Sequence, residues 1–243
     1  MITYPRIAPV GLSGVLVSFA AEMEDRANLA AIAFRAAVDA ENWPDVIETS
    51  STLVSAFVAV DLSTTDYDDI AARLSRLLGQ KDWLAAAPKS GRRLWTLPMC
   101  FEDEHAPQLD ESARAAGLTT VEARTSLQNA RTRVITLGYA PGQPYLGLLD
   151  KVWDIPRQTE VTPQVPAGAL VLAIRQFVLF TAAMPTGWRH VGQTAFLPFD
   201  AQRDQPVALS PGDEIRFAPI TSAEFATFKQ GDSLGGATSE PIS

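Results

Sequence analysis

Two different spacings of apolar residues constrain the fold of this 243-residue chain more than any other feature of its sequence. Up to about residue 100, short alternating runs, typical of strands, take turns with segments whose apolar residues recur every three or four positions, typical of amphipathic helices. After residue 131 only short β-rich runs remain, separated by turns that contain Pro and Gly. The two patterns suit different layer architectures, so the sequence predicts two domains of different class.

The first hundred residues predict a small α+β domain. We expect one helix over 25–40 and a second that begins near Asp66 and ends at Gly79. Strands are expected at 15–19, 43–48, 53–60 and 94–98. Strand, helix, strand, strand, helix, strand is the order found in ferredoxin-like domains, so we expect such a domain over residues 1–90.

The rest of the chain predicts an all-β barrel that follows short helices. Thr119 and Glu122 have the spacing of a capping box, which marks a helix start. We expect strands at 133–137, 169–174, 177–181 and 214–217, and short strands separated by turns are typical of a small barrel. The barrel domain is expected to span residues 91–228, and the Gly- and Ser-rich tail 229–243 is expected to be disordered.

Charge and the scarcity of reactive side chains exclude several classes of function. With a net charge of −8 and 20 evenly spread Lys and Arg residues, the chain has no basic stripe, so neither nucleic acid nor a membrane surface is an expected partner. The single cysteine, Cys100, excludes an intramolecular disulfide, and a zinc site would need both His105 and His190 together with carboxylates. We expect no bound metal. The first residues lack a signal-peptide pattern, so we expect a cytoplasmic protein.

Gly and Pro are densest in the segment 137–147, Leu-Gly-Tyr-Ala-Pro-Gly-Gln-Pro-Tyr-Leu-Gly. Glycine admits positive φ and lets backbone amides approach a ligand, whereas proline fixes turns. The Gly-Lys-Ser/Thr ending of a phosphate loop is absent. Two interpretations stay open: a structural turn, which composition alone favours, or a ligand-binding loop in which Tyr139 and Tyr145 stack on a ligand rather than anchor the fold.

Seven ordered blocks between residues 133 and 217 resemble a known family. The blocks are Arg133-Val134, the segment 137–147, Ile155-Pro-Arg157, Val165-Pro-Ala-Gly168, Pro185-Thr-Gly-Trp188, Val191-Gly-Gln-Thr194 and Pro211-Gly-Asp-Glu-Ile-Arg-Phe217. In this order and spacing they are similar to the carboxyltransferase subdomain C/D family. Its members include allophanate hydrolase subunit 1, the B subunit of 5-oxoprolinase and the sporulation kinase inhibitor KipI.

This resemblance implies a ferredoxin-like domain followed by a cyclophilin-like β-barrel, in a chain that does not act alone. Family members pair with a protein of the type of allophanate hydrolase subunit 2 or the C subunit of 5-oxoprolinase. In the 5-oxoprolinase system a third subunit joins, and the assembly couples ATP hydrolysis to the opening of a cyclic amide. We therefore expect a non-autonomous subunit of an ATP-dependent amide hydrolase that acts on a small cyclic amide or a ureido acid. ATP is expected at the level of the complex, and no biotin on this chain.

Departures from the family pattern keep two alternatives open. Leu127 stands where many relatives carry His, Ile174 and Arg175 replace glycines, and Gln143 replaces an aromatic residue. These losses favour a non-catalytic protein-binding module of the KipI type. The other alternative is a component of a biotin-dependent carboxyltransferase, although the chain has no Met-Lys-Met segment of a biotin carrier.

Residues expected to bind the substrate or a partner lie in or beside these blocks: Arg133, Tyr139, Gly142, Tyr145, Arg175, Gln176 and His190. Arg175 and Gln176 are expected on an apolar strand, where a guanidinium and an amide suit either a carboxylate or amide ligand or a contact with a partner subunit. His190 either serves as an acid or base near neutral pH or points outward beside an inward-facing Trp188. No catalytic residue is assigned, because the sequence shows no Ser-His-Asp or Cys-His pattern that would pair a nucleophile with a base.

Overall fold

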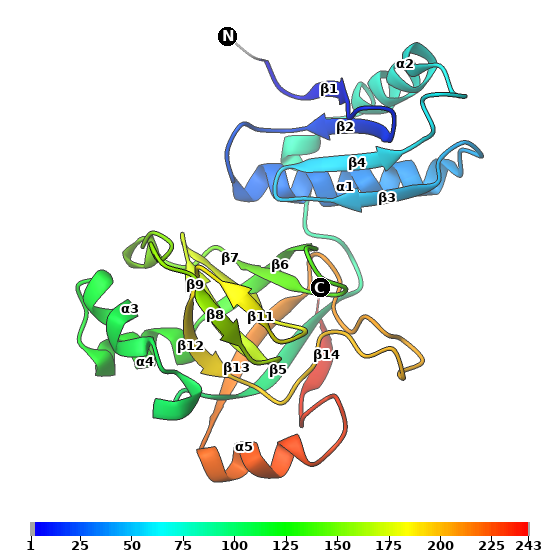
Figure 1. Ribbon diagram of the computed structural model, residues 1–243. Helices are drawn as coiled ribbons and strands as arrows, with labels where there is room; N and C mark the ends of the chain where they lie inside the picture. Colours follow the sequence, from blue (N-terminus) through cyan, green and yellow to red (C-terminus); the bar gives the residue numbers. More distant parts are fainter. Residues whose placement is uncertain (1–2, 243) are drawn as a thin grey trace. The chain divides into compact units, whose positions relative to one another are not determined.

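The computed structural model describes residues 3–242, and the chain divides between Ser90 and Gly91 into two compact units (Figure 1). Each unit has its own hydrophobic core, and each is described by itself. No helix in the described part of the chain is long and apolar enough to cross a membrane.

The first unit is a four-stranded antiparallel sheet with helices. The strands lie in the order β1-β2-β4-β3, and their bounds are β1 (Arg6–Pro9), β2 (Gly14–Ser18), β3 (Glu48–Ser51) and β4 (Ser55–Ala59). The helices are α1 (Asp25–Glu41), α2 (Tyr67–Leu78) and the short 3₁₀ helix η1 (Trp83–Ala85). Phe34 of α1 packs edge-on against Trp83 in the core between helices and sheet. The expected α+β class is confirmed.

Two expectations for this unit need correction. The expected last strand, 94–98, enters the barrel of the second unit, and β1 completes the first sheet instead. An alternating run predicts a strand but not its partner, and the edge strand β1 is only four residues long, with no fully buried side chain to mark it. The expected strand at 43–48 is also wrong: that segment is a turn, and β3 starts only at Glu48.

The second unit is a β-barrel closed by seven strands. The strands are β5 (Arg92–Cys100), β6 (Arg131–Leu137), β7 (Pro144–Gly147), β9 (Ala169–Ala173), β10 (Gln176–Leu179), β12 (Arg189–Gln193) and β13 (Glu214–Ile220). Around the ring they follow the order β12-β9-β10-β7-β6-β13-β5, and the pairing of Gln193 with Cys100 closes it. The expected all-β barrel is confirmed.

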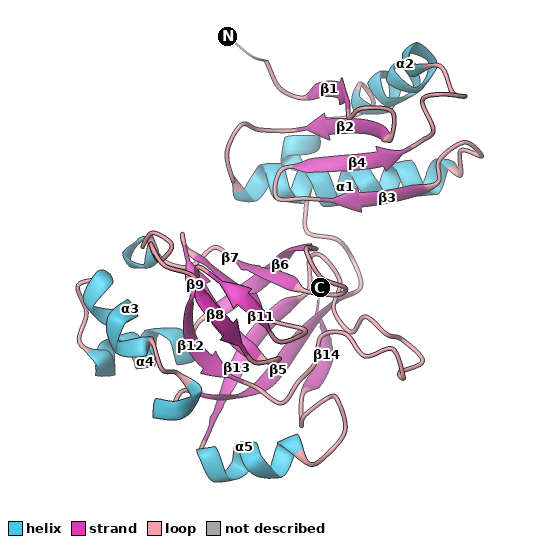
Figure 2. Cartoon of the chain, in the orientation of Figure 1, coloured by secondary structure: helices cyan, strands magenta, loops and turns pink. Residues whose placement is uncertain are grey.

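Short helices lie on the outside of the barrel, on one side and at one end (Figure 2). They are η2 (Asp103–His105), α3 (Leu109–Ala115), α4 (Thr120–Gln128), η3 (Lys151–Trp153) and α5 (Ser222–Lys229). The capping box predicted at the start of α4 is present: Thr119 Oγ1 accepts from the Glu122 N–H, and the Glu122 carboxylate accepts from the Thr119 N–H.

The expectation of a disordered tail over 229–243 is wrong for the described residues. Strand β14 (Thr238–Ile242) pairs with β5 over five residues. On that edge of β5, strand β12 reaches only Cys100, so backbone donors and acceptors of Arg92–Thr96 are available to another strand. Main-chain hydrogen bonds order this tail without an apolar sequence signal. Ser243 lies outside the described residues.

A second layer covers part of the outer face of the barrel. It is a two-stranded sheet of β8 (Thr162–Val165) and β11 (Met184–Thr186). Because side chains alternate along a strand, Leu172 and Phe177 belong to the barrel core, whereas Val171 and Val178 belong to a smaller core that contains Trp188. The site described next lies in this layer.

Candidate functional site

A cavity of about 500 Å³ lies between the outer face of strands β7 and β10 and the layer of β8 and β11. Its volume falls within the range of small-molecule sites. It is lined by Tyr139, Gln143, Tyr145, Arg157, Gln158, Val161, Val178, Phe180, Pro185, Thr186, Gly187 and Trp188. Three of the seven sequence blocks thus meet here: 137–147, 155–157 and 185–188.

One wall of the cavity is aromatic. Tyr145 on β7 and Trp188 after β11 meet edge to face with ring centres 6.2 Å apart. Burial raises the pKa of the Tyr145 phenol, an effect that the nearby positive charge of Arg157 opposes. Trp188 is 7% exposed and packs in the small core, so it serves both as a core anchor and as part of the cavity wall.

Arg157 supplies the charge of the cavity. Its guanidinium carbon lies 5.4 Å from the centre of the Trp188 ring, a cation–π arrangement. Among the described residues that line the cavity, Arg157 is the single charged side chain, and within residues 3–242 it forms no ion pair with a carboxylate. A guanidinium presents a planar fork of donors that matches a carboxylate, so the cavity favours an anionic ligand.

Gln143 brings an amide without a hydrogen-bond partner to the same cavity. It is 1% exposed, and its Oε1 has no partner in the described structure. Its backbone is fixed, because its N–H donates to Ala140 and its carbonyl accepts from Gly138. A buried polar group that lacks a partner costs about 1–3 kcal/mol. This cost makes Gln143 a candidate for contact with a ligand.

Gly142 sets the position of Gln143. Its φ is +64°, in the left-handed region, and a Cβ added there would lie 3.0 Å from the Phe199 Cβ. Only glycine avoids both the backbone strain and the close contact at this position. The Gly-Pro loop therefore acts as a turn and as a cavity wall, which combines the two interpretations left open from its sequence.

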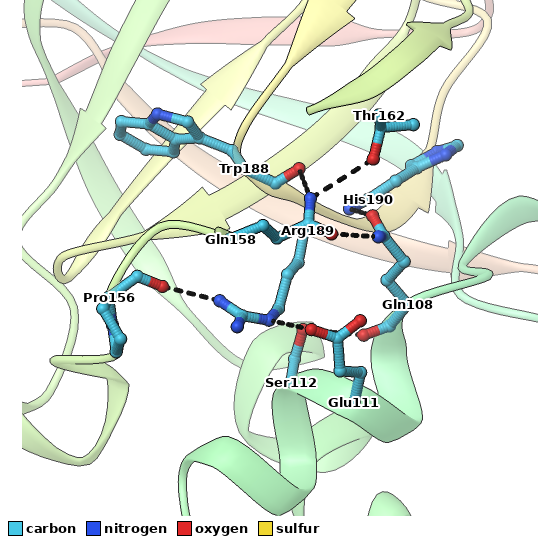
Figure 3. A network of polar contacts seen from close by, with 9 residues as sticks. All are labelled: Gln108, Glu111, Ser112, Pro156, Gln158, Thr162, Trp188, Arg189 and His190. Carbon is cyan, nitrogen blue, oxygen red and sulfur yellow. Dashed lines mark hydrogen bonds and ion pairs between the residues drawn. The ribbon is translucent and has the colours of Figure 1, made fainter. Parts of the chain in front are cut away.

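A network of polar contacts holds the backbone on both sides of Arg157 (Figure 3). Before it, the Pro156 carbonyl accepts from Arg189 Nη1 at 2.6 Å, and Arg189 Nε donates to Glu111 Oε1 at 2.8 Å. After it, the Gln158 N–H donates to the Gly187 carbonyl at 2.7 Å. These contacts fix the segment from which the exposed guanidinium extends over Trp188.

The side chain of Gln158 links this segment to helix α3 (Figure 3). Its Nε2 donates to the Trp188 carbonyl at 3.0 Å, and its Oε1 accepts from Gln108 Nε2 at 2.6 Å. Gln108 Oε1 in turn accepts from the His190 N–H at 2.7 Å. The amide of Gln158 is therefore committed to the fold, whereas that of Gln143 is available.

His190 does not point outward and does not line the cavity. Its ring is 4% exposed, and its Nε2 lies 3.0 Å from the Gly192 carbonyl oxygen. Burial lowers the pKa of His190 to about 4, so the ring is neutral at neutral pH. All five residues of β12 are buried because Gln108, at the start of α3, and the barrel cover its two faces, so alternation does not expose this side chain.

Arg175 is not on a strand. Ile174 and Arg175 have φ values of 44° and 61° and form the two-residue turn between β9 and β10, where both central residues need positive φ. This geometry explains why glycines suit these positions. Arg175 Nε donates to the Leu149 carbonyl at 2.9 Å, and the side chain does not line the cavity.

The remaining expected site residues also lie away from the cavity lining. Gln176 on β10 and Arg133 on β6 are each in register with Gly147 of β7, so they flank a glycine on one face of the sheet. Leu127 is fully buried in the barrel core. Of the seven residues expected to bind substrate or partner, Tyr139 and Tyr145 line the cavity and Gly142 supports its wall.

Sequence reasoning did not single out Arg157 or Gln143 as ligand contacts. Arg157 is the last residue of one of the seven sequence blocks, and Gln143 stands out in the sequence only because it replaces an aromatic residue. The sequence signal that could have identified Gln143 is a polar residue beside a turn, at a position where relatives carry an aromatic residue. No group of three metal-ligating side chains occurs in the part of the chain that the structure describes.

Comparisons with known proteins agree on one family. The model described as "Carboxyltransferase domain, subdomain C and D" matches residues 5–209. The B subunit of 5-oxoprolinase from Bacillus subtilis (strain 168) is 26% identical over 235 residues, which cover 93% of this chain and 97% of that protein. The B subunit of 5-oxoprolinase from Escherichia coli O157:H7 is 32% identical over 181 residues, which cover 73% of this chain and 80% of that protein.

Two of the solved structures that match are of longer chains. The crystal structure of Kluyveromyces lactis urea carboxylase superimposes with a TM-score of 0.78 at 18% identity, covering 97% of this chain and 24% of that one. Likewise, the chain spans 40% of the length of the protein named TTHA0988, with a TM-score of 0.73 at 25% identity. The urea carboxylase match shows that both units share a known fold.

Proposed function

The chain belongs to the carboxyltransferase domain subdomain C and D family, and on that premise we propose that it is the component of a 5-oxoprolinase that corresponds to the B subunit. In this role the chain forms a complex with proteins that correspond to the A and C subunits. The complex opens the ring of 5-oxoproline, a cyclic amide, at the expense of ATP.

The observation that carries the proposal is similarity over nearly the whole chain to curated B subunits of 5-oxoprolinases. The match to the Bacillus subtilis protein covers 93% of this chain and 97% of that protein, so both units correspond and no large domain is unmatched. An isolated barrel match would have supported only a shared fold.

The composition of the cavity supports a role that needs partners. Amide hydrolysis requires groups that activate a nucleophile and protonate the leaving nitrogen. Among the described residues that line the cavity there is no Asp, Glu, His, Cys or Lys. The cavity therefore suits binding and orientation, and we assign the reacting groups and ATP to the complex.

Reconstitution tests the proposal. The purified chain, its two partner proteins of the A and C types, and all combinations are assayed for glutamate formation from 5-oxoproline and for phosphate release from ATP. We expect turnover only when this chain and its partners are combined, and only with ATP. Turnover by the chain alone, or a full complex whose turnover is unchanged when this chain is omitted, would refute the proposal.

Allophanate is the comparison substrate in the same assay. Turnover of allophanate but not of 5-oxoproline would reassign the chain to the allophanate hydrolase type. A complex that forms with neither activity, together with inhibition of a protein kinase by the chain, would favour the protein-binding alternative.

A further inference from the structure

Besides the two tyrosine hydroxyls, the cavity contains two polar groups that can still bind a ligand, a guanidinium and an amide. The guanidinium of Arg157 stacks on Trp188 without a carboxylate partner in the described structure. The amide of Gln143 is almost fully buried, and its oxygen has no partner among residues 3–242. The other polar side chains of the lining whose contacts are known, such as Gln158 and Thr186, already hold the fold together.

Each of these groups has a chemical complement. A guanidinium pairs with a carboxylate through two parallel hydrogen bonds. A primary amide offers one donor and one acceptor along a single edge. The group that matches this edge is an amide whose N–H and C=O lie on the same side, and this cis arrangement is the one that a small ring imposes on a lactam.

We propose that this cavity is the site at which the chain binds a small lactam that carries a carboxylate, with Gln143 on the lactam edge and Arg157 on the carboxylate. The inference rests on the proposed function for its choice of ligand, 5-oxoproline, but the donor and acceptor pattern is derived from the cavity alone. The ring methylenes of such a ligand would pack against two apolar residues that line the same cavity, Val178 and Phe180.

The backbone beside each of the two groups is held in place before a ligand binds. Arg157 lies between Pro156 and Gln158, whose backbones are held by Arg189 and Gly187. Gln143 follows Gly142 in a loop closed by two backbone hydrogen bonds. Groups that are fixed before binding lose less conformational entropy when the ligand arrives, which strengthens binding.

Binding to the isolated chain is measured by calorimetry with three ligands that differ by one group. They are 5-oxoproline, its carboxamide, which lacks the negative charge, and the matching lactone acid, in which a ring oxygen replaces the N–H. We expect 5-oxoproline to bind, and each of the other two to bind at least about tenfold more weakly, the loss associated with one good hydrogen bond or ion pair. Equal affinity for all three ligands would overturn the proposal.

Variants of the chain test the same contacts from the protein side. Arg157→Gln should weaken binding of 5-oxoproline about tenfold or more and leave the affinity for the uncharged carboxamide unchanged. Gln143→Met, which keeps the volume but removes the amide, should erase the preference for the lactam over the lactone. Arg114→Gln, a matched change of an exposed arginine on α3, should alter neither. Circular dichroism checks that each variant is folded.

Failure of the site and failure of the function are distinguishable. If the reconstituted complex turns over 5-oxoproline while Arg157→Gln changes neither binding nor KM, the cavity assignment is wrong and the proposed function stands. If the chain binds 5-oxoproline with the expected dependence on Arg157 but the complex does not turn it over, the site stands and the proposed function is wrong.

Discussion

His190 should make the stability of the barrel unit depend on pH in a predictable direction. The ring is 4% exposed and its pKa is lowered by burial to about 4, against an ordinary value of 6.5. Below pH 6.5 the unfolded chain binds a proton at this position that the folded chain does not bind. The free energy of unfolding therefore falls as the pH decreases from about 6.5 to about 4. Above this window the contribution of the neutral His190 ring to stability is complete.

The magnitude follows from the two pKa values. One pKa unit corresponds to about 1.4 kcal/mol, so the full loss by pH 4 is about 3 kcal/mol. At pH 5, where the unfolded histidine is almost fully protonated and the folded one is mostly neutral, the loss is about 2 kcal/mol. This is a large share of the stability of a domain.

Urea unfolding at about pH 7.5 and about pH 5, for wild type and His190→Gln, measures the effect. Carboxylates contribute equally in both proteins, so the difference between them isolates the histidine at position 190. We expect His190→Gln to lose about 2 kcal/mol less than wild type between the two pH values.

The chain has only two histidines, so NMR titration assigns each ring directly. A His190 ring that titrates near 6.5, or an identical pH dependence in His190→Gln and wild type, would refute the reasoning.

Three further predictions concern the backbone. Limited trypsin digestion should cut first at Lys89, which is exposed near the end of the first unit, and a first cut inside 131–217 would contradict the division. Gly168→Ala should destabilise the barrel by roughly 3 kcal/mol in thermal unfolding, because φ is +79° and a Cβ would lie 2.0 Å from the Thr194 carbonyl oxygen; an unchanged Tm would show that this turn relaxes. Replacing Ile174-Arg175 by Asn-Gly should raise stability by about 1 kcal/mol. The change relieves backbone strain at two positive-φ residues, and it loses the hydrogen bond from Arg175 to the Leu149 carbonyl. A lower Tm would show that the hydrogen bond of Arg175 stabilises the protein by more than the strained turn destabilises it.

Local signals in the sequence predicted local structure well. The capping box at Thr119 and Glu122 and the end of α2 at Gly79 depend on residues a few positions apart, and both are present. Strand partners depend on distant residues. The run at Leu94 was correctly predicted as a strand but placed in the wrong sheet, because its pairing with β13 is decided elsewhere in the chain.

The same distinction explains what was predicted of the candidate site. Tyr139 and Tyr145 flank a loop rich in Gly and Pro, a local signal, and both line the cavity. Arg157 is a candidate because its guanidinium lies over the ring of Trp188, a residue 31 positions later that follows β11, and no local pattern predicts this contact. His190 was misplaced because alternation predicts which face a side chain takes but not whether a helix covers that face.

The two partners of β5 have a consequence for how the protein forms during synthesis. Strand β5 starts the second unit, yet it pairs with β13, whose Arg216 bonds to Thr96 across 120 positions of sequence, and then with β14. Every contact within the first unit involves residues up to 90, so that unit is complete long before β13 leaves the ribosome. Until Thr238–Ile242 emerges, β5 presents an unpaired edge of main-chain donors and acceptors to other nascent chains. Partner proteins made at the same time would therefore encounter a folded first unit and a second unit in which this edge of β5 is still unpaired.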